Sequence, residues 1–186
     1  DGKKEKKYIT YVGSFDEHKG LNVLLDASER IATDFKVLLI GGKTPEQKET
    51  VEKLINQKGL KDKVIITNWV NKKELGDLLE QTIVGILPLK PTFFNKYLTS
   101  PLKLFDFYSY KIPVVASDIP NLRELIIEGK TGMFFQPDNS RELSKKINYL
   151  LSNSELVEKM ISEINKFSQD LFWDERARKI FNLINS

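Results

Sequence analysis

Short runs of consecutive apolar residues, each stopped by glycine or proline, most constrain how this chain of 186 residues can fold. The clearest runs are residues 36–40 and 83–87, which are followed by Gly41-Gly42 and by Pro88. A run that is apolar on both faces is typical of a strand in a parallel sheet covered on both sides. Segments with helical spacing alternate with these runs. The sequence therefore predicts an α/β fold with a Rossmann-like, doubly wound parallel sheet.

The loops that follow the strands are expected to meet at one edge of this sheet. Crossovers between parallel strands are right-handed, which places every such loop at the carboxyl ends of the strands. Strands are predicted at residues 8–12, 36–40, 64–66, 83–87, 113–117 and 133–135. Helices are predicted at residues 20–33, 45–58, 72–80, 101–110, 121–128, 140–151, 154–170 and 174–185.

Residues 88–100 are predicted to form a long loop on that edge, with Phe93, Phe94 and Tyr97 partly exposed. Long loops at this position are usually functional or mobile. Two interpretations of the aromatic side chains stay open: they cover the edge of the core, or they dock against a further domain.

The composition fits a single domain spanning residues 1–186, with 40% apolar and 30% charged residues. The net charge of +3 is small, and the basic residues 1–7 are interpreted as a linker remnant rather than a nucleic-acid site. No apolar run approaches the roughly 20 residues that span a bilayer, so a cytoplasmic domain is expected. The chain has no cysteine and one histidine, His18, which excludes thiolate and multi-histidine metal sites.

The strongest local signal lies at residues 100–106. Ser100 suits the N-cap of a helix and Pro101 its first position, where a missing N–H costs nothing. The first-turn amides and the Lys103 cation would then face an arriving anion. Asp106 follows one turn later. The pattern predicts a phosphate at the start of the helix with hydroxyl groups beside it.

Four motifs resemble those of the group 1 (family 4) retaining glycosyltransferases. The run Ser-Pro-Leu-Lys-Leu-Phe-Asp-Phe at residues 100–107, followed by Ile-Pro-Val-Val-Ala-Ser-Asp-Ile-Pro at 112–120, resembles the donor-binding segment of that family. Residues 11–27 resemble its opening motif, with glycine, lysine and paired leucines at matching positions. Residues 39–42 and 129–132 add two further matches. Together the motifs are spread in order over nearly the whole chain.

This resemblance implies one half of a GT-B enzyme, the C-terminal domain that binds the nucleotide-sugar donor. It implies a retaining hexosyltransferase whose glycan or lipid-linked acceptor binds a missing N-terminal domain, with no cofactor and no metal. Residues 171–186 would form a helix that crosses to that domain, and the full-length protein would associate peripherally with membranes. The implied donor contacts are Gly13, Lys19, Ser100, Pro101, Leu102 and Lys103 for the diphosphate, Asp106 for the ribose, and Trp69 and Val70 for the base.

The chain departs from the family pattern at four positions. The family carries two glutamates eight positions apart; Asp106 stands at the second and Leu98 at the first. Ser14 replaces the usual arginine or asparagine after the first glycine, and Lys111 replaces a glycine before the Pro-Val-Val segment. We therefore expect weaker or differently selective donor binding than in typical members. No general base is apparent, so the isolated chain is expected to bind the donor but scarcely to catalyse.

Plainer interpretations of the same residues remain. Lys19 could be a solvated lysine, Trp69 a packing residue, and Asp106 a surface carboxylate paired with Lys103. Two other functions also stay open. A nucleotide-sugar epimerase would need acid and base carboxylates in the cleft. A non-enzymatic interaction module would be insensitive to Lys19→Ala and Lys103→Ala.

Overall fold

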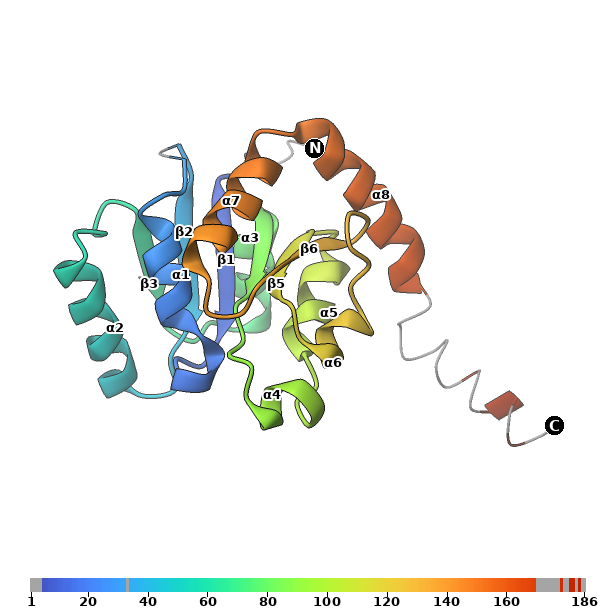
Figure 1. Ribbon diagram of the computed structural model, residues 1–186, viewed down its shortest axis with the longest axis horizontal. Coiled ribbons are helices and arrows are strands. Elements are labelled where there is room, and N and C mark those ends of the chain that lie inside the picture. The colour runs from blue at the N-terminus through green and yellow to red at the C-terminus, as the bar shows by residue number, and fades with distance from the viewer. Residues whose placement is uncertain (1–4, 33, 170–177, 179–180, 183, 185–186) are drawn as a thin grey trace.

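The computed structural model describes residues 5–32, 34–169, 178, 181–182 and 184. Six parallel strands form one sheet in the order β3-β2-β1-β4-β5-β6, which confirms the doubly wound, Rossmann-like prediction (Figure 1). Each strand lies within one residue of its predicted bounds. The strands are β1 (Tyr8–Gly13), β2 (Lys36–Gly41), β3 (Val64–Thr67), β4 (Thr82–Leu87), β5 (Val114–Ser117) and β6 (Gly132–Phe135).

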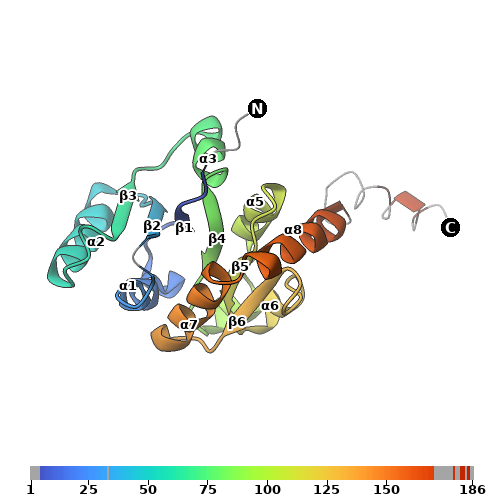
Figure 2. The same cartoon turned by 90° about the horizontal axis from the view of Figure 1, so that it is seen from above.

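Helices cover both faces of the sheet, as Figure 2 shows most clearly for α1 and α7 on one side and α3 and α5 on the other. Side chains of α1, α2 and α7 pack in one apolar cluster, and those of α3, α5 and α6 in a second. Helix α8 contributes Met160 to the first cluster and Ile164 to the second. The helices are α1 (Leu21–Ser28), α2 (Pro45–Gln57), α3 (Lys72–Leu79), α4 (Phe93–Tyr97), α5 (Leu102–Ser109), α6 (Pro120–Arg123), α7 (Ser140–Leu151) and α8 (Ser154–Gln169).

Two predicted helices are shorter than expected. The helix predicted at 20–33 begins after a 3₁₀ turn, η1 (Glu17–Lys19), and ends at Ser28. Ile31 is buried beyond that end, so the apolar spacing continues into a turn. The helix predicted at 121–128 is the single turn α6, although Ile126 still packs in the core. The spacing of apolar residues indicates which side chains are buried, and side chains in turns can be buried as well as those in helices.

The segment predicted as a loop at 88–100 contains the short helix α4, capped by the Thr92 hydroxyl, which accepts from the Asn95 N–H at 3.2 Å. Phe93, Phe94 and Tyr97 are 70%, 53% and 60% exposed. The partial exposure that the sequence predicted is confirmed, and these side chains do not cover the core edge. The helix predicted at 174–185 lies largely outside the described residues. Within the described part of the chain, no helix is long and apolar enough to cross a membrane.

A tight backbone contact joins the β1 and β4 connections. Gly20 has the left-handed φ of 70°, and a Cβ placed there would lie 1.8 Å from the Pro88 carbonyl oxygen. Only glycine avoids both the strained conformation and this clash. The segment that ends at Gly20 therefore packs directly against the chain that follows β4.

We expect Gly20→Ala to lower the free energy of unfolding by about 2–5 kcal/mol, because the left-handed strain and the steric clash add. Gly59→Ala is the matched control. Gly59 has a similar φ of 66° with open space around it, so only the strain of about 1 kcal/mol applies. Urea unfolding measures both; equal losses would show that the contact with Pro88 relaxes without cost.

Candidate functional site

A cavity of about 240 Å³ opens at the carboxyl ends of β1 and β4. These neighbouring strands are the point where the strand order reverses, since β1 leads outward to β2 and β4 leads the other way to β5. Ligands of open α/β sheets bind at such a point. The cavity brings together all but two of the predicted donor contacts: Gly13, Lys19, Trp69, Ser100, Pro101, Leu102 and Lys103 line it.

Val70 and Asp106 do not line the cavity. The partly buried Val70 packs against the apolar cluster on the α5 face of the sheet. The Asp106 carboxylate forms an ion pair with Lys103, with 2.9 Å between Oδ2 and Nζ. Asp106 thus reaches the cavity wall only through the lysine one turn before it.

The start of α5 differs from the prediction. Pro101 occupies the N-cap with a ψ of 64°, outside the helical region, and the helix begins at Leu102. Ser100 provides no side-chain cap, so its predicted N-cap role is wrong. Its carbonyl instead accepts the Leu102 N–H at 2.9 Å. Because Pro101 leaves the helical conformation, the helix starts one residue later than the sequence indicates.

Lys103 lies between an aromatic ring and a carboxylate. Its ammonium is 5.8 Å from the centroid of the Trp69 ring and pairs with Asp106. Trp69 is 60% exposed and so offers most of its ring to solvent. The structure therefore does not support the interpretation of Trp69 as a packing residue.

Lys19 is half-buried in the part of the cavity wall that the loop after β1 contributes. Burial lowers its pKa from the ordinary value of 10.5, the nearby Asp16 carboxylate partly opposes that shift, and the neighbouring Lys43 ammonium adds to it. Two cations therefore lie close enough to disfavour one another. A bound anion would relieve that repulsion.

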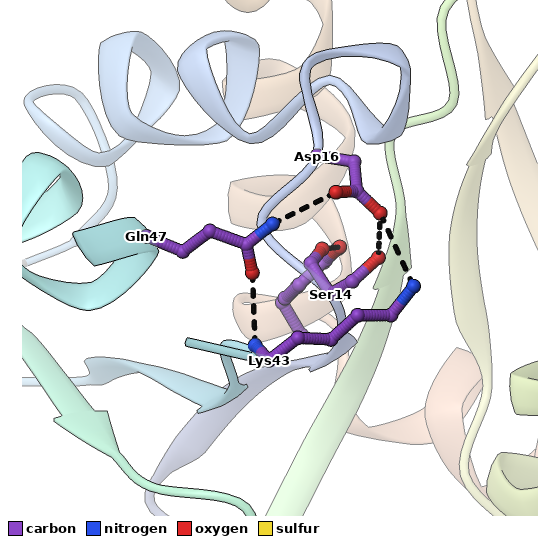
Figure 3. Close-up of polar contacts among 5 residues, drawn as sticks. Ser14, Asp16, Lys43 and Gln47 are labelled. Carbon is purple, nitrogen blue, oxygen red and sulfur yellow. Dashed lines mark hydrogen bonds and ion pairs between the residues drawn. The ribbon is translucent and has the colours of Figure 1, made fainter. Parts of the chain in front are cut away.

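Figure 3 shows how Asp16 holds this wall together. One carboxylate oxygen accepts from the Ser14 hydroxyl at 2.5 Å and lies 3.7 Å from the Lys43 ammonium; the other accepts from the Gln47 amide at 2.8 Å. The hydrogen bond from Ser14 is the main cause that lowers the pKa of Asp16, with smaller contributions from Lys43 and Gln47. Asp16 therefore stays ionised and holds Lys43 beside Lys19.

Lys43 is the cation that the sequence analysis missed. It lines the cavity from the loop after β2, directly beyond Gly41-Gly42. Strand register places Gly41 beside Gly13, so the two loops leave the sheet together. The sequence predicts that the loop after Gly41-Gly42 lies at this edge of the sheet, which is the signal that points to Lys43. Within the described ranges, no group of three or more histidine, aspartate and glutamate side chains could hold a metal ion.

Comparison with known proteins identifies the family. The model of the family "Glycosyl transferases group 1" matches residues 1–167. The chain belongs to the group 1 glycosyltransferases.

Relatives of this glycosyltransferase chain are similar over most of its length. It is 25% identical over 161 residues to alpha-D-kanosaminyltransferase from Streptomyces kanamyceticus, covering 86% of this chain and 40% of that protein. It is 26% identical over 183 residues to chitobiosyldiphosphodolichol beta-mannosyltransferase from Debaryomyces hansenii, covering 91% and 38%. The chain thus spans about two fifths of these relatives.

Solved structures share its fold. Sucrose-phosphate synthase from Thermosynechococcus elongatus superposes with a TM-score of 0.84 at 22% identity, covering 97% of this chain and 45% of that one. Anabaena HepE in complex with UDP and glucose gives 0.81 at 19%, covering 100% and 50%. These matches confirm the fold expected for one half of a GT-B glycosyltransferase.

The charges around Lys19 predict opposite effects of two substitutions on its pKa. Asp16→Asn should lower the pKa further by removing a favourable charge, and Lys43→Met should raise it by removing a like charge. NMR titration of the lysine side chains measures both, with exposed Lys53→Met on α2 as the control that changes nothing. Shifts of the same sign in both variants would contradict the arrangement.

The lowered pKa of Lys19 determines how the free energy of unfolding changes with pH. Below its folded-state pKa, Lys19 is protonated in both states and its burial opposes folding. As the pH rises from that pKa to 10.5, the unfolded chain binds more protons and this opposition is lost.

Proposed function

We propose that the chain is the donor-binding half of a retaining hexosyltransferase, which moves a sugar from a nucleotide diphosphate sugar to a glycan or lipid-linked acceptor. The observation that carries the proposal is the meeting of Lys19, Lys43 and Lys103 in one cavity at the switch point of the sheet. The three cations come from three separate loops, so no single sequence motif accounts for their convergence.

The lysines suit a diphosphate because they face it from two walls. Lys19 and Lys43 approach from the β1 and β2 loops, and Lys103 from the start of α5. As the sugar leaves, negative charge develops on the terminal phosphate. Cations that are already in place stabilise that charge without reorganising, which is where electrostatic catalysis contributes most.

The nucleoside would lie beside Trp69 and Asp106. The exposed Trp69 ring offers a flat apolar face for the base, and Asp106 could accept hydrogen bonds from the ribose hydroxyls once Lys103 turns toward phosphate. Val70 would reach the base through its main chain, since its partly buried side chain packs against the apolar cluster. No metal or cofactor is part of this proposal.

The acceptor and its activation belong to the remainder of the protein. The chain spans about two fifths of its relatives, so we expect it to bind the donor and scarcely to transfer sugar. The name of the Debaryomyces relative specifies a dolichol-linked acceptor, which supports a lipid-linked or glycan acceptor here. The cytoplasmic location and the peripheral membrane association remain predictions.

The two other functions have less support. The family model and the named relatives are glycosyltransferases, which favours sugar transfer over epimerisation. An interaction module gives no reason for three cations to converge in a cavity.

Calorimetric titration with UDP, GDP and ADP tests the proposal. We expect one diphosphate to bind and Lys19→Ala or Lys103→Ala to weaken it by about 10- to 100-fold, as for hydrogen bonds to charged groups. Lys43→Ala should cost about three- to tenfold, because its side chain is 66% exposed. Lys53→Ala is the matched control, an exposed lysine paired with Glu49 far from the cavity. Equal effects in all four variants, or no binding of any diphosphate, would overturn it.

Asp106→Ala separates the two roles open to that carboxylate. If Asp106 binds the ribose, the variant should lose about tenfold or more in affinity for the nucleoside diphosphate and nothing for inorganic diphosphate. If Asp106 only neutralises Lys103, both ligands should bind more tightly. Parallel titrations with the two ligands distinguish these outcomes.

A further inference from the structure

Asn95 is fully buried on α4, a five-residue helix whose Phe93, Phe94 and Tyr97 side chains are exposed. A helix this short is not stable by itself, so its place depends on contacts with other segments. A buried carboxamide at the centre of an exposed helix therefore needs a reason beyond the helix.

The Asn95 amide group joins two separate connections. Nδ2 donates to the His18 carbonyl at 2.7 Å and to the Lys90 carbonyl at 2.8 Å, which uses both of its protons. The Lys90 N–H also donates to the His18 carbonyl, at 3.1 Å. His18 directly precedes Lys19, so these bonds fasten the backbone of the β1 loop to the chain leaving β4.

The far end of α4 is fastened as well. Thr99 Oγ1 lies 3.5 Å from Asn95 Oδ1, and the Asn121 amide on α6 donates to the Thr99 carbonyl at 2.9 Å. Thr99 lines the cavity just before the segment that starts α5. Asn95 thus stands behind the cavity, linked toward Lys19 on one side and toward the start of α5 on the other.

We propose that Asn95 is a positioning residue of the donor site, which fixes Lys19 relative to the start of α5 without touching the ligand. This inference rests on the proposed function. Asn95 does not line the cavity, so it acts through the backbone that carries Lys19. Truncating it removes one of the two hydrogen bonds that each of the His18 and Lys90 carbonyls accepts, so the β1 loop and the chain leaving β4 are held less firmly together.

Calorimetry with the tightest-binding diphosphate tests this on the full chain. We expect Asn95→Ala to weaken binding by about tenfold or more while the chain stays folded. Thr82→Val is the matched control, since Thr82 is equally buried and hydrogen-bonded to Thr10, but at the amino ends of the strands. It should leave affinity within about twofold.

Coupling to Lys19 separates positioning from general destabilisation. In a Lys19→Ala background, Asn95→Ala should cost less than about threefold, because the group that it positions is gone. Full multiplication of the two effects, or wild-type affinity in Asn95→Ala, would overturn the inference. If Asn95→Ala does not fold, Asn121→Ala replaces it as the test, because the half-buried Asn121 holds Thr99 at the other end of the same set of contacts. Weaker diphosphate binding by this variant supports the inference, and unchanged binding overturns it.

The failure of the wider proposal looks different. A wild-type chain that binds none of UDP, GDP or ADP would overturn the proposed function, and this inference with it. A wild-type chain that binds one of them, with an Asn95→Ala variant that binds equally well, would overturn this inference alone.

Discussion

The side-by-side placement of β1 and β4 is the constraint on which the whole site depends. Their connections leave in opposite directions, so no crossover helix closes the space above their carboxyl ends. The two loops are nevertheless held together, because Gly20 has no side chain to keep the Pro88 carbonyl away. The cavity therefore forms above the carboxyl ends of β1 and β4, and the contact between Gly20 and Pro88 fixes the two loops that line it.

Charge is balanced within those walls. Lys43 lies beside Asp16 and Lys103 pairs with Asp106, while the field of Asp16 also favours the charged form of the half-buried Lys19. Burial is the main cause that lowers the pKa of Lys19, and the repulsion from Lys43 adds a smaller cost. An anion in the cavity would remove that cost. The side chains that balance these charges are also the ones that we propose to bind the phosphates of the donor.

Much of the fold and part of the site could be predicted from sequence. Short runs of apolar and β-branched residues mark the strands, including the partly exposed edge strand β3, which is why all six were placed within one residue. Lys19 and Lys103 were found because each stands in a local pattern of glycine, serine or proline. Asp16, Lys43 and Asn95 were missed, since each acts through a partner in another loop or helix: Asp16 and Lys43 through one another, and Asn95 through His18. Local errors had local causes: Pro101 leaves the helical conformation, and turns bury apolar residues as helices do.

The sequence by itself determined the alternation of strands and helices, and with it the family and the edge of the sheet where a ligand would bind. These properties follow from short-range patterns of apolar residues, glycine and proline. Only the tertiary structure decided which side chains face one another across that edge. Strand order brings the β1, β2 and β4 loops together, and the distances between their charges depend on backbone contacts between segments far apart in the chain. Spacing along one segment carries no record of those contacts, so the third lysine and the asparagine behind the cavity became visible only in the fold.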